Sequence, residues 1–153
     1  MDLQMISTYI RLSFLLVLFV GALHLSTAQT RSCARTCNVL YRCSPYYKEL
    51  VYAVVDGVCR VYQNGCIFGN ENCTRVNQCQ SPLSSTSAEK CKEFCPRRCP
   101  RGGQEVCGWF PFINSNGENS DRYIAFANRC LLDQYSCQNN IAYAYEPTLG
   151  PCP

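Results

Sequence analysis

Long hydrophobic runs are scarce in this sequence, and the most apolar run is too short to cross a membrane. Twelve weakly polar or apolar residues lie between Arg11 and His24, whereas a membrane-spanning helix needs roughly 20. Small residues follow at Ser26 and Ala28. This pattern is typical of a cleaved secretory signal peptide, which we predict for residues 1–28; an uncleaved anchor is the alternative. We therefore expect a secreted, extracellular protein that does not bind a membrane.

Histidine is almost absent, because the single one, His24, lies in the predicted signal peptide. The remaining chain lacks the usual general base for a serine or cysteine nucleophile. It also lacks histidine ligands for zinc, and no pair of closely spaced C-x-x-C motifs supplies a four-cysteine site. We therefore expect no catalytic triad, no metal and no cofactor.

Charged residues are also few. After Ala28 the chain carries thirteen Lys and Arg against ten Asp and Glu, a net charge of +3. No basic stripe extends beyond Arg97, Arg98 and Arg101, so nucleic-acid binding has no support. Four carboxylates share one region: Glu105, Glu118, Asp121 and Asp133. Nothing in their spacing holds two of them in apposition, so we interpret them as surface charge and expect no enzyme.

Cysteine, by contrast, is abundant. All fourteen cysteines lie in the 125 residues after the predicted cleavage point, a density typical of small extracellular disulfide scaffolds. In such scaffolds, cross-links that each contribute about 2–4 kcal/mol substitute for a large apolar core. Because the count is even, all fourteen can pair, which leaves no thiolate for nucleophilic chemistry.

A cysteine-free segment rich in Ser and Thr, residues 80–90, divides the cysteines seven and seven. We interpret it as a linker between residues 29–79 and residues 91–153. Both halves open with C-x3-C and later contain C-x6-C after an asparagine, in VYQNGCIFGNENC and AFANRCLLDQYSC, which indicates a diverged internal repeat. Seven cysteines cannot all pair within one half, so one from each must join the other half or leave the molecule. We predict a bond between Cys33 and Cys91, which precede the other six in each half.

Secondary structure can be predicted coarsely. Cys130 and Cys137 would share one face of a helix that Asn128 can cap. The matching segment Cys66–Cys73 contains glycines and asparagines, which predict a shorter or irregular helix. Short strands are expected where β-branched and aromatic residues concentrate: Leu50–Val55, Glu105–Phe110 and Ile141–Tyr145.

The second half resembles a Kazal-type domain, the family of small serine-protease inhibitors and follistatin-like modules. The resemblance spans about residues 95–152 and is carried by CPRRCPRGGQEVCG, then FANRCLLDQYSC, then LGPC at the end. In the first half it is weaker and rests on Val58-Cys59, Tyr62-x-Asn64-x-Cys66 and the following cysteine, as in a degenerate copy.

The family's bonding order implies particular disulfides. Among the family's six cysteines, the first pairs with the fifth, the second with the fourth and the third with the sixth. In the second half this order implies Cys95–Cys137, Cys99–Cys130 and Cys107–Cys152. Carried to the first half, it implies Cys37–Cys73, Cys43–Cys66 and Cys59–Cys79.

The resemblance also implies a function. Family inhibitors present an extended loop after the second cysteine, and the residue two positions beyond it enters the protease's main specificity pocket. Here the loop is Cys99-Pro100-Arg101-Gly102, and Arg101 would offer a guanidinium to the pocket carboxylate of a trypsin-like enzyme. Asn128 would hydrogen-bond this loop from behind, in addition to or instead of capping the helix.

Three features depart from the family pattern. Gly102 and Gly103 stand where the family has larger residues, and paired glycines should loosen the loop. The gap of 22 residues between Cys107 and Cys130 is longer than in the family. In the first half, the loop after Cys43 is enlarged to fifteen residues and places Pro45 at the specificity position.

We therefore expect a small disulfide-rich α+β protein with two Kazal-like modules, each a short helix with a small antiparallel sheet. The favoured function is inhibition of an extracellular trypsin-like serine protease. The alternatives are a non-inhibitory extracellular binding or signalling module and a cross-linked structural component, since the chain contains ten tyrosines. Asn72-Cys73-Thr74 is a glycosylation sequon.

Overall fold

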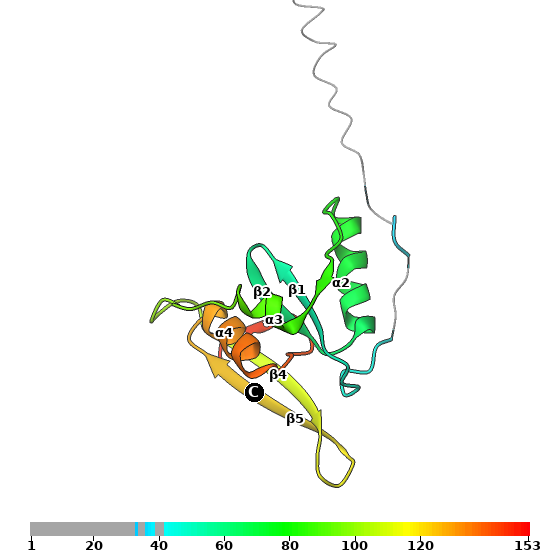
Figure 1. The fold of residues 1–153 in the computed structure, drawn as a ribbon. Coiled ribbons are helices and arrows are strands. Elements are labelled where there is room, and N and C mark those ends of the chain that lie inside the picture. Colours follow the sequence, from blue (N-terminus) through cyan, green and yellow to red (C-terminus); the bar gives the residue numbers. More distant parts are fainter. Residues whose placement is uncertain (1–32, 34–35, 39–41) are drawn as a thin grey trace, which may run out of the picture. The chain divides into compact units, whose positions relative to one another are not determined.

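Two antiparallel hairpins organise the chain (Figure 1). In the computed structural model, β1 (Val51–Val55) turns into β2 (Val58–Tyr62) through Asp56 and Gly57, whose φ angles are 50° and 78°. Positive φ at both central residues is the mark of the two-residue turn that Asp-Gly favours, because its twist matches that of the strands. The predicted strand Leu50–Val55 is confirmed to within one residue.

The second hairpin is longer. β4 (Val106–Ile113) pairs with β5 (Asn119–Phe126) over eight residues, so the enlarged gap in the second half forms an extension of the sheet. The prediction of a strand at Glu105–Phe110 is confirmed, although β4 runs three residues further. The predicted strand Ile141–Tyr145 is wrong, because that segment joins β4 through the single backbone bond from Ala144 N to Trp109 O (3.0 Å).

In each hairpin, the first strand also pairs with one further short strand. β3 (Ser85–Thr86) pairs with β1, and β6 (Thr148–Leu149) pairs with β4. The two sheets therefore have equivalent orders, β2-β1-β3 and β5-β4-β6. The small disulfide-rich α+β fold class predicted from the sequence is confirmed.

A helix follows each hairpin directly. α2 (Gly65–Asn77) and α4 (Arg129–Asn139) have 13 and 11 residues, so the prediction of a shorter helix in the first half is wrong. Gly65 occupies the first position of α2, where a glycine does not weaken the helix interior, and only Gly69 lies within the helix. Two disulfides further fix α2 through Cys66 and Cys73.

The segment predicted as a linker, residues 80–90, takes part in the first sheet. It contains β3, and α3 (Ala88–Lys92) begins within it. Residues 33–153 form one compact unit, in which α4 contacts β2 of the first hairpin as well as β4 and β5. The division into modules at residues 29–79 and 91–153 stays a prediction.

The structure describes residue 33, residues 36–38 and residues 42–153. The predicted signal peptide, residues 1–28, lies outside the described residues. Within the described part of the chain, no helix has the length and apolar character needed to span a membrane.

Seven disulfides cross-link the chain, and five have the partners that the family order implies. These five are Cys37–Cys73, Cys43–Cys66, Cys95–Cys137, Cys99–Cys130 and Cys107–Cys152. The remaining two correct the prediction, because Cys33 bonds to Cys79 and Cys59 bonds to Cys91. Neither the predicted Cys59–Cys79 bond nor the predicted Cys33–Cys91 bond is present.

The Asp56-Gly57 turn explains this difference. Cys59 follows the turn and lies on the second strand of its hairpin, whereas Cys107 lies on the first strand of the other hairpin. The two cysteines are therefore not structural equivalents, although both follow a valine. The Asp-Gly pair is a strong hairpin signal in the sequence, and it would have separated them.

The core is centred on two adjacent disulfides. Cys59, Cys91 and Cys137 are at most 2% exposed, and the sulfurs of Cys59, Cys95 and Cys137 lie within 4.8 Å of one another. These sulfurs belong to the Cys59–Cys91 and Cys95–Cys137 bonds, so they are not metal ligands. The core therefore joins the two halves covalently.

Candidate binding loop

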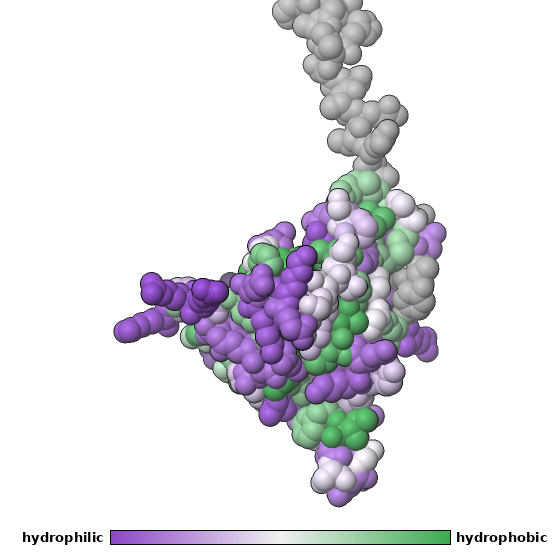
Figure 2. Space-filling view, in the orientation of Figure 1, coloured by the Kyte–Doolittle hydropathy of each residue, from purple (hydrophilic) through white to green (hydrophobic). Residues whose placement is uncertain are grey.

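The loop between α3 and β4 projects from the compact unit (Figure 1), and Figure 2 shows that this projection is hydrophilic. Pro100, Arg101, Gly102 and Gly103 are all exposed. No hydrogen bond or ion pair engages the Arg101 side chain in the described structure. The predicted specificity residue is thus presented to solvent.

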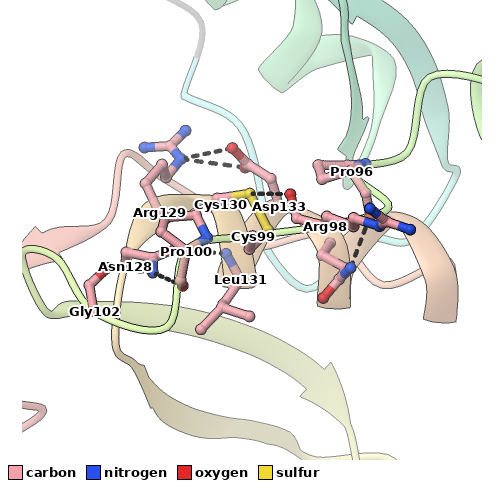
Figure 3. Close-up of a disulfide and its surroundings, with 11 residues drawn as sticks. Pro96, Arg98, Cys99, Pro100, Gly102, Asn128, Arg129, Cys130, Leu131 and Asp133 are labelled. Carbon is pink, nitrogen blue, oxygen red and sulfur yellow. Dashed lines mark hydrogen bonds and ion pairs between the residues drawn. A yellow bond between two sulfur atoms is a disulfide. The ribbon is translucent and has the colours of Figure 1, made fainter.

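Asn128 holds this loop from behind (Figure 3). Its Nδ2 donates to Pro100 O (2.9 Å) and to Gly102 O (3.0 Å), the carbonyls on either side of Arg101. Its Oδ1 accepts from Leu131 N (3.0 Å), which caps α4. The side chain fulfils both of the roles considered for it, and at 7% exposure it is buried behind the loop.

Further contacts fix the chain before Arg101. The Cys99–Cys130 disulfide joins the loop to the first turn of α4, and Cys130 Sγ lies 3.9 Å from Arg98 O. Gln134 Nε2, one turn further along α4, donates to Pro96 O (2.8 Å). The backbone from Pro96 to Gly102 is therefore attached at several points to a single helix.

Gly103 is required by the geometry of this support. Its φ of 143° is one that side chains rarely adopt, and an added Cβ would lie 3.0 Å from Cβ of Asn128. The family's larger residue therefore does not fit here. At Gly102 an added Cβ would meet nothing within 4 Å. The expectation that both glycines loosen the loop overlooked the close approach at Gly103.

A polar network lies under the start of α4. Arg129 Nε contacts both carboxylate oxygens of Asp133 (3.2 Å each), and its other nitrogens bond to Tyr143 Oη (2.8 Å) and to Glu146. Burial opposes the charge of Arg129, but Tyr143, Glu146 and Asp133 raise its pKa. Tyr143 Oη in turn donates to Asp133 (2.8 Å). Because Arg129 follows Asn128 directly, this network fixes the backbone that carries the loop support.

Sequence reasoning did not assign a role to Asn64, which holds a second loop in the same way. Asn64 Nδ2 donates to Ser44 O (2.9 Å) and Tyr47 O (2.8 Å), and its Oδ1 accepts from Ile67 N (3.0 Å). This loop includes Pro45, the predicted counterpart of Arg101. The shared Asn-x-Cys motif is the signal that could have predicted the second support.

Asn72, the predicted glycosylation site, interacts with the loop before β3. Its Nδ2 donates to Leu83 O (3.1 Å) and its Oδ1 accepts from Leu83 N (2.6 Å). Attachment of a glycan to Nδ2 would compete with the first of these bonds. Glycosylation at Asn72 stays a prediction.

The chain is similar to a curated protein of Dolopus genitalis that is named as a U-Kazal protein. The two are 26% identical over 113 residues, which are 69% of this chain and 48% of that protein. The chain thus spans about half the length of this relative. No family model and no solved structure matches the chain. The name of the relative and the seven disulfides fit a Kazal-like domain.

Proposed function

We propose that the protein is a secreted Kazal-like inhibitor of an extracellular trypsin-like serine protease, with Arg101 as its specificity residue. The observation that carries this proposal is the pair of hydrogen bonds from Asn128 to the carbonyls of Pro100 and Gly102. They hold the backbone on both sides of an exposed arginine that has no partner. The Kazal-named relative supports the same class of function.

Inhibition follows from the rigidity of the loop. Because the backbone around Arg101 is already ordered, binding to a protease costs little conformational entropy. If the bond between Arg101 and Gly102 is cut, the new ends stay attached through the Cys99–Cys130 disulfide and through the bond from Asn128 to Gly102. The ends therefore remain close enough to rejoin, and the cleaved chain leaves the protease slowly.

The primary contact is a charged pair. The planar guanidinium of Arg101 can bond to both oxygens of a carboxylate at the base of the protease pocket. A bidentate pair in a water-excluded pocket contributes more than an exposed ion pair. We accordingly assign no catalytic step to the chain itself.

Arg101→Glu tests the proposal. The unaltered protein should inhibit trypsin stoichiometrically, and the variant should show no inhibition, because a carboxylate would face the pocket carboxylate. Lys48→Glu makes the same charge change at another exposed position and should leave inhibition unchanged. Turnover of the unaltered protein as an ordinary substrate would contradict the proposal.

A non-inhibitory protein-binding module is the second candidate. The β4–β5 hairpin exposes Phe112 and Ile113 near its tip, at 42% and 54%, and Tyr123 further along β5, at 48%. Exposed apolar groups of this kind occur at protein contacts. Stable binding of a cell-surface protein by the Arg101→Glu variant would favour this candidate.

We also infer secretion after cleavage behind Ala28. The fourteen paired cysteines support an oxidising compartment. The secreted protein from expressing cells should begin at Gln29, which N-terminal sequencing can establish. A secreted form that retains residues 1–28 would contradict this inference.

A further inference from the structure

The loop carries three arginines within five residues, Arg97, Arg98 and Arg101. All three are exposed, and no ion pair engages them in the described structure. Arg129, which lies in the helix behind them, has two carboxylate partners. Cations clustered without counter-charges repel one another, so an acidic partner outside the chain would stabilise them.

The backbone on both sides of Arg98 is also held against α4. The carbonyl of Arg98 contacts Cys130 Sγ, and the next residue, Cys99, is disulfide-bonded to the same helix. On its other side, Pro96 O accepts from Gln134. Three residues of chain span at most about 10 Å, so the two arginine Cα atoms are held within that separation before any partner binds.

Arg97 differs from Arg98, although the two are neighbours. It lines a cleft together with Glu93 and Asp133 of the same chain. Arg97 is therefore the arginine of the loop that borders a cleft lined by carboxylates of the same chain. Arg98 and Arg101 remain as the pair of cations presented on an ordered backbone.

We propose that the target protease has a second acidic subsite, which binds Arg98 while the main pocket binds Arg101. This inference rests on the proposed function. The partner is then a processing protease that selects arginine at the first and fourth positions before the cut bond. A protease with a single acidic pocket would pair with Arg101 and leave Arg98 without a counter-charge. Pairing both arginines adds a second desolvated ion pair to the interface.

The test compares Arg98→Ala with Arg97→Ala against two enzymes. One is trypsin, and the other is a furin-type protease, which requires arginine at both positions. Arg98→Ala should weaken inhibition of the furin-type enzyme about 30-fold or more, as expected for loss of a buried interfacial charge pair. It should weaken inhibition of trypsin less than about 3-fold. Arg97→Ala should change the inhibition of either enzyme by less than about 3-fold.

The outcomes separate this inference from the proposed function. Equal effects of Arg98→Ala on the two enzymes, or inhibition of trypsin alone, would overturn the second subsite and leave inhibition standing. Absence of inhibition toward both enzymes would overturn the inference together with the proposed function. Because both side chains are exposed, unchanged near-ultraviolet circular dichroism should show that the variants keep the fold.

Discussion

Asn64 and Asn128 support two loops of the same construction, but the loops differ in what they contact. Each asparagine caps a helix through Oδ1 and donates from Nδ2 to two loop carbonyls at 2.8–3.0 Å. The second loop extends Arg101 into solvent. The first instead contacts the second half, because Tyr46 packs edge-on against Trp109 and donates to Asp121 (3.0 Å).

This difference shows how one supported loop can serve two purposes. In the second half, the supported loop is exposed to solvent. In the first half, the same support holds Tyr46 against β4 and β5, and Gln63 adds a long bond to Pro111 O (3.5 Å). We therefore expect the first loop to hold the two halves together rather than to inhibit a protease.

The largest effect should come from breaking the covalent link between the halves. Replacing both Cys59 and Cys91 with Ala removes a fully buried disulfide and leaves a cavity. The free energy of unfolding should fall by about 4 kcal/mol, which lowers Tm by about 15 °C. Differential scanning calorimetry measures this change.

The control is the other disulfide outside the family order, Cys33–Cys79. Its loop is longer, with a sequence separation of 46 against 32, so chain entropy alone would make it slightly more stabilising. Its cysteines are not in the core, and its removal should cost about half as much. A larger loss for the Cys33–Cys79 variant would show that the shared core does not join the halves as described.

A smaller effect separates the two asparagines. Asn64→Ala and Asn128→Ala each remove a helix cap and two hydrogen bonds to loop carbonyls, so each should cost about 2 kcal/mol of stability. Only Asn128→Ala should also weaken protease inhibition, by roughly 10- to 100-fold, because the loop around Arg101 loses its order.

Inhibition constants and thermal unfolding of both variants provide the comparison. Inhibition that weakens equally in the two variants would contradict the division of roles between the loops. A loss confined to Asn64→Ala would reverse it.

The smallest effect is a pH dependence. Burial, together with nearby Glu71, raises the pKa of Tyr62 in the first half from 10.0 to about 12. A raised pKa in the folded state means that the stability from neutral Tyr62 is fully present below about pH 10. It is lost as pH rises towards 12. Because the side chain is partly exposed, the loss should be only about 1 kcal/mol.

Tyr143 gives the matching case in the second half, since burial and then Asp133 raise its pKa as well.

Denaturant unfolding at pH values from 9 to 12 measures the effect of Tyr62. The free energy of unfolding should depend less on pH for Tyr62→Phe than for the unaltered protein. An unchanged slope would mean that Tyr62 ionises without cost in the folded protein.

Much of the second half could be predicted from its sequence because its signals are local. The spacing from Asn128 to Cys137 predicts the capped helix, and the resemblance of this half to a Kazal-type domain implies an exposed loop at Arg101 beside a disulfide. The first half was predicted less well. Gly65, Gly69 and two asparagines lowered the expected length of α2. The valine before Cys59 concealed that this cysteine follows the turn.

The sequence by itself determined a disulfide scaffold and the repeated asparagine-and-cysteine pattern, and the family resemblance of its second half singled out Arg101. Each of these depends on residues close together in the chain. Only the tertiary structure decided that Cys59 bonds to Cys91 and that Tyr46 meets Asp121, which lies 75 residues away. Spacing does not encode these choices, because a disulfide or hydrogen bond forms between groups that packing brings together. That packing explains why the first loop contacts the second half, whereas the second loop extends Arg101 into solvent.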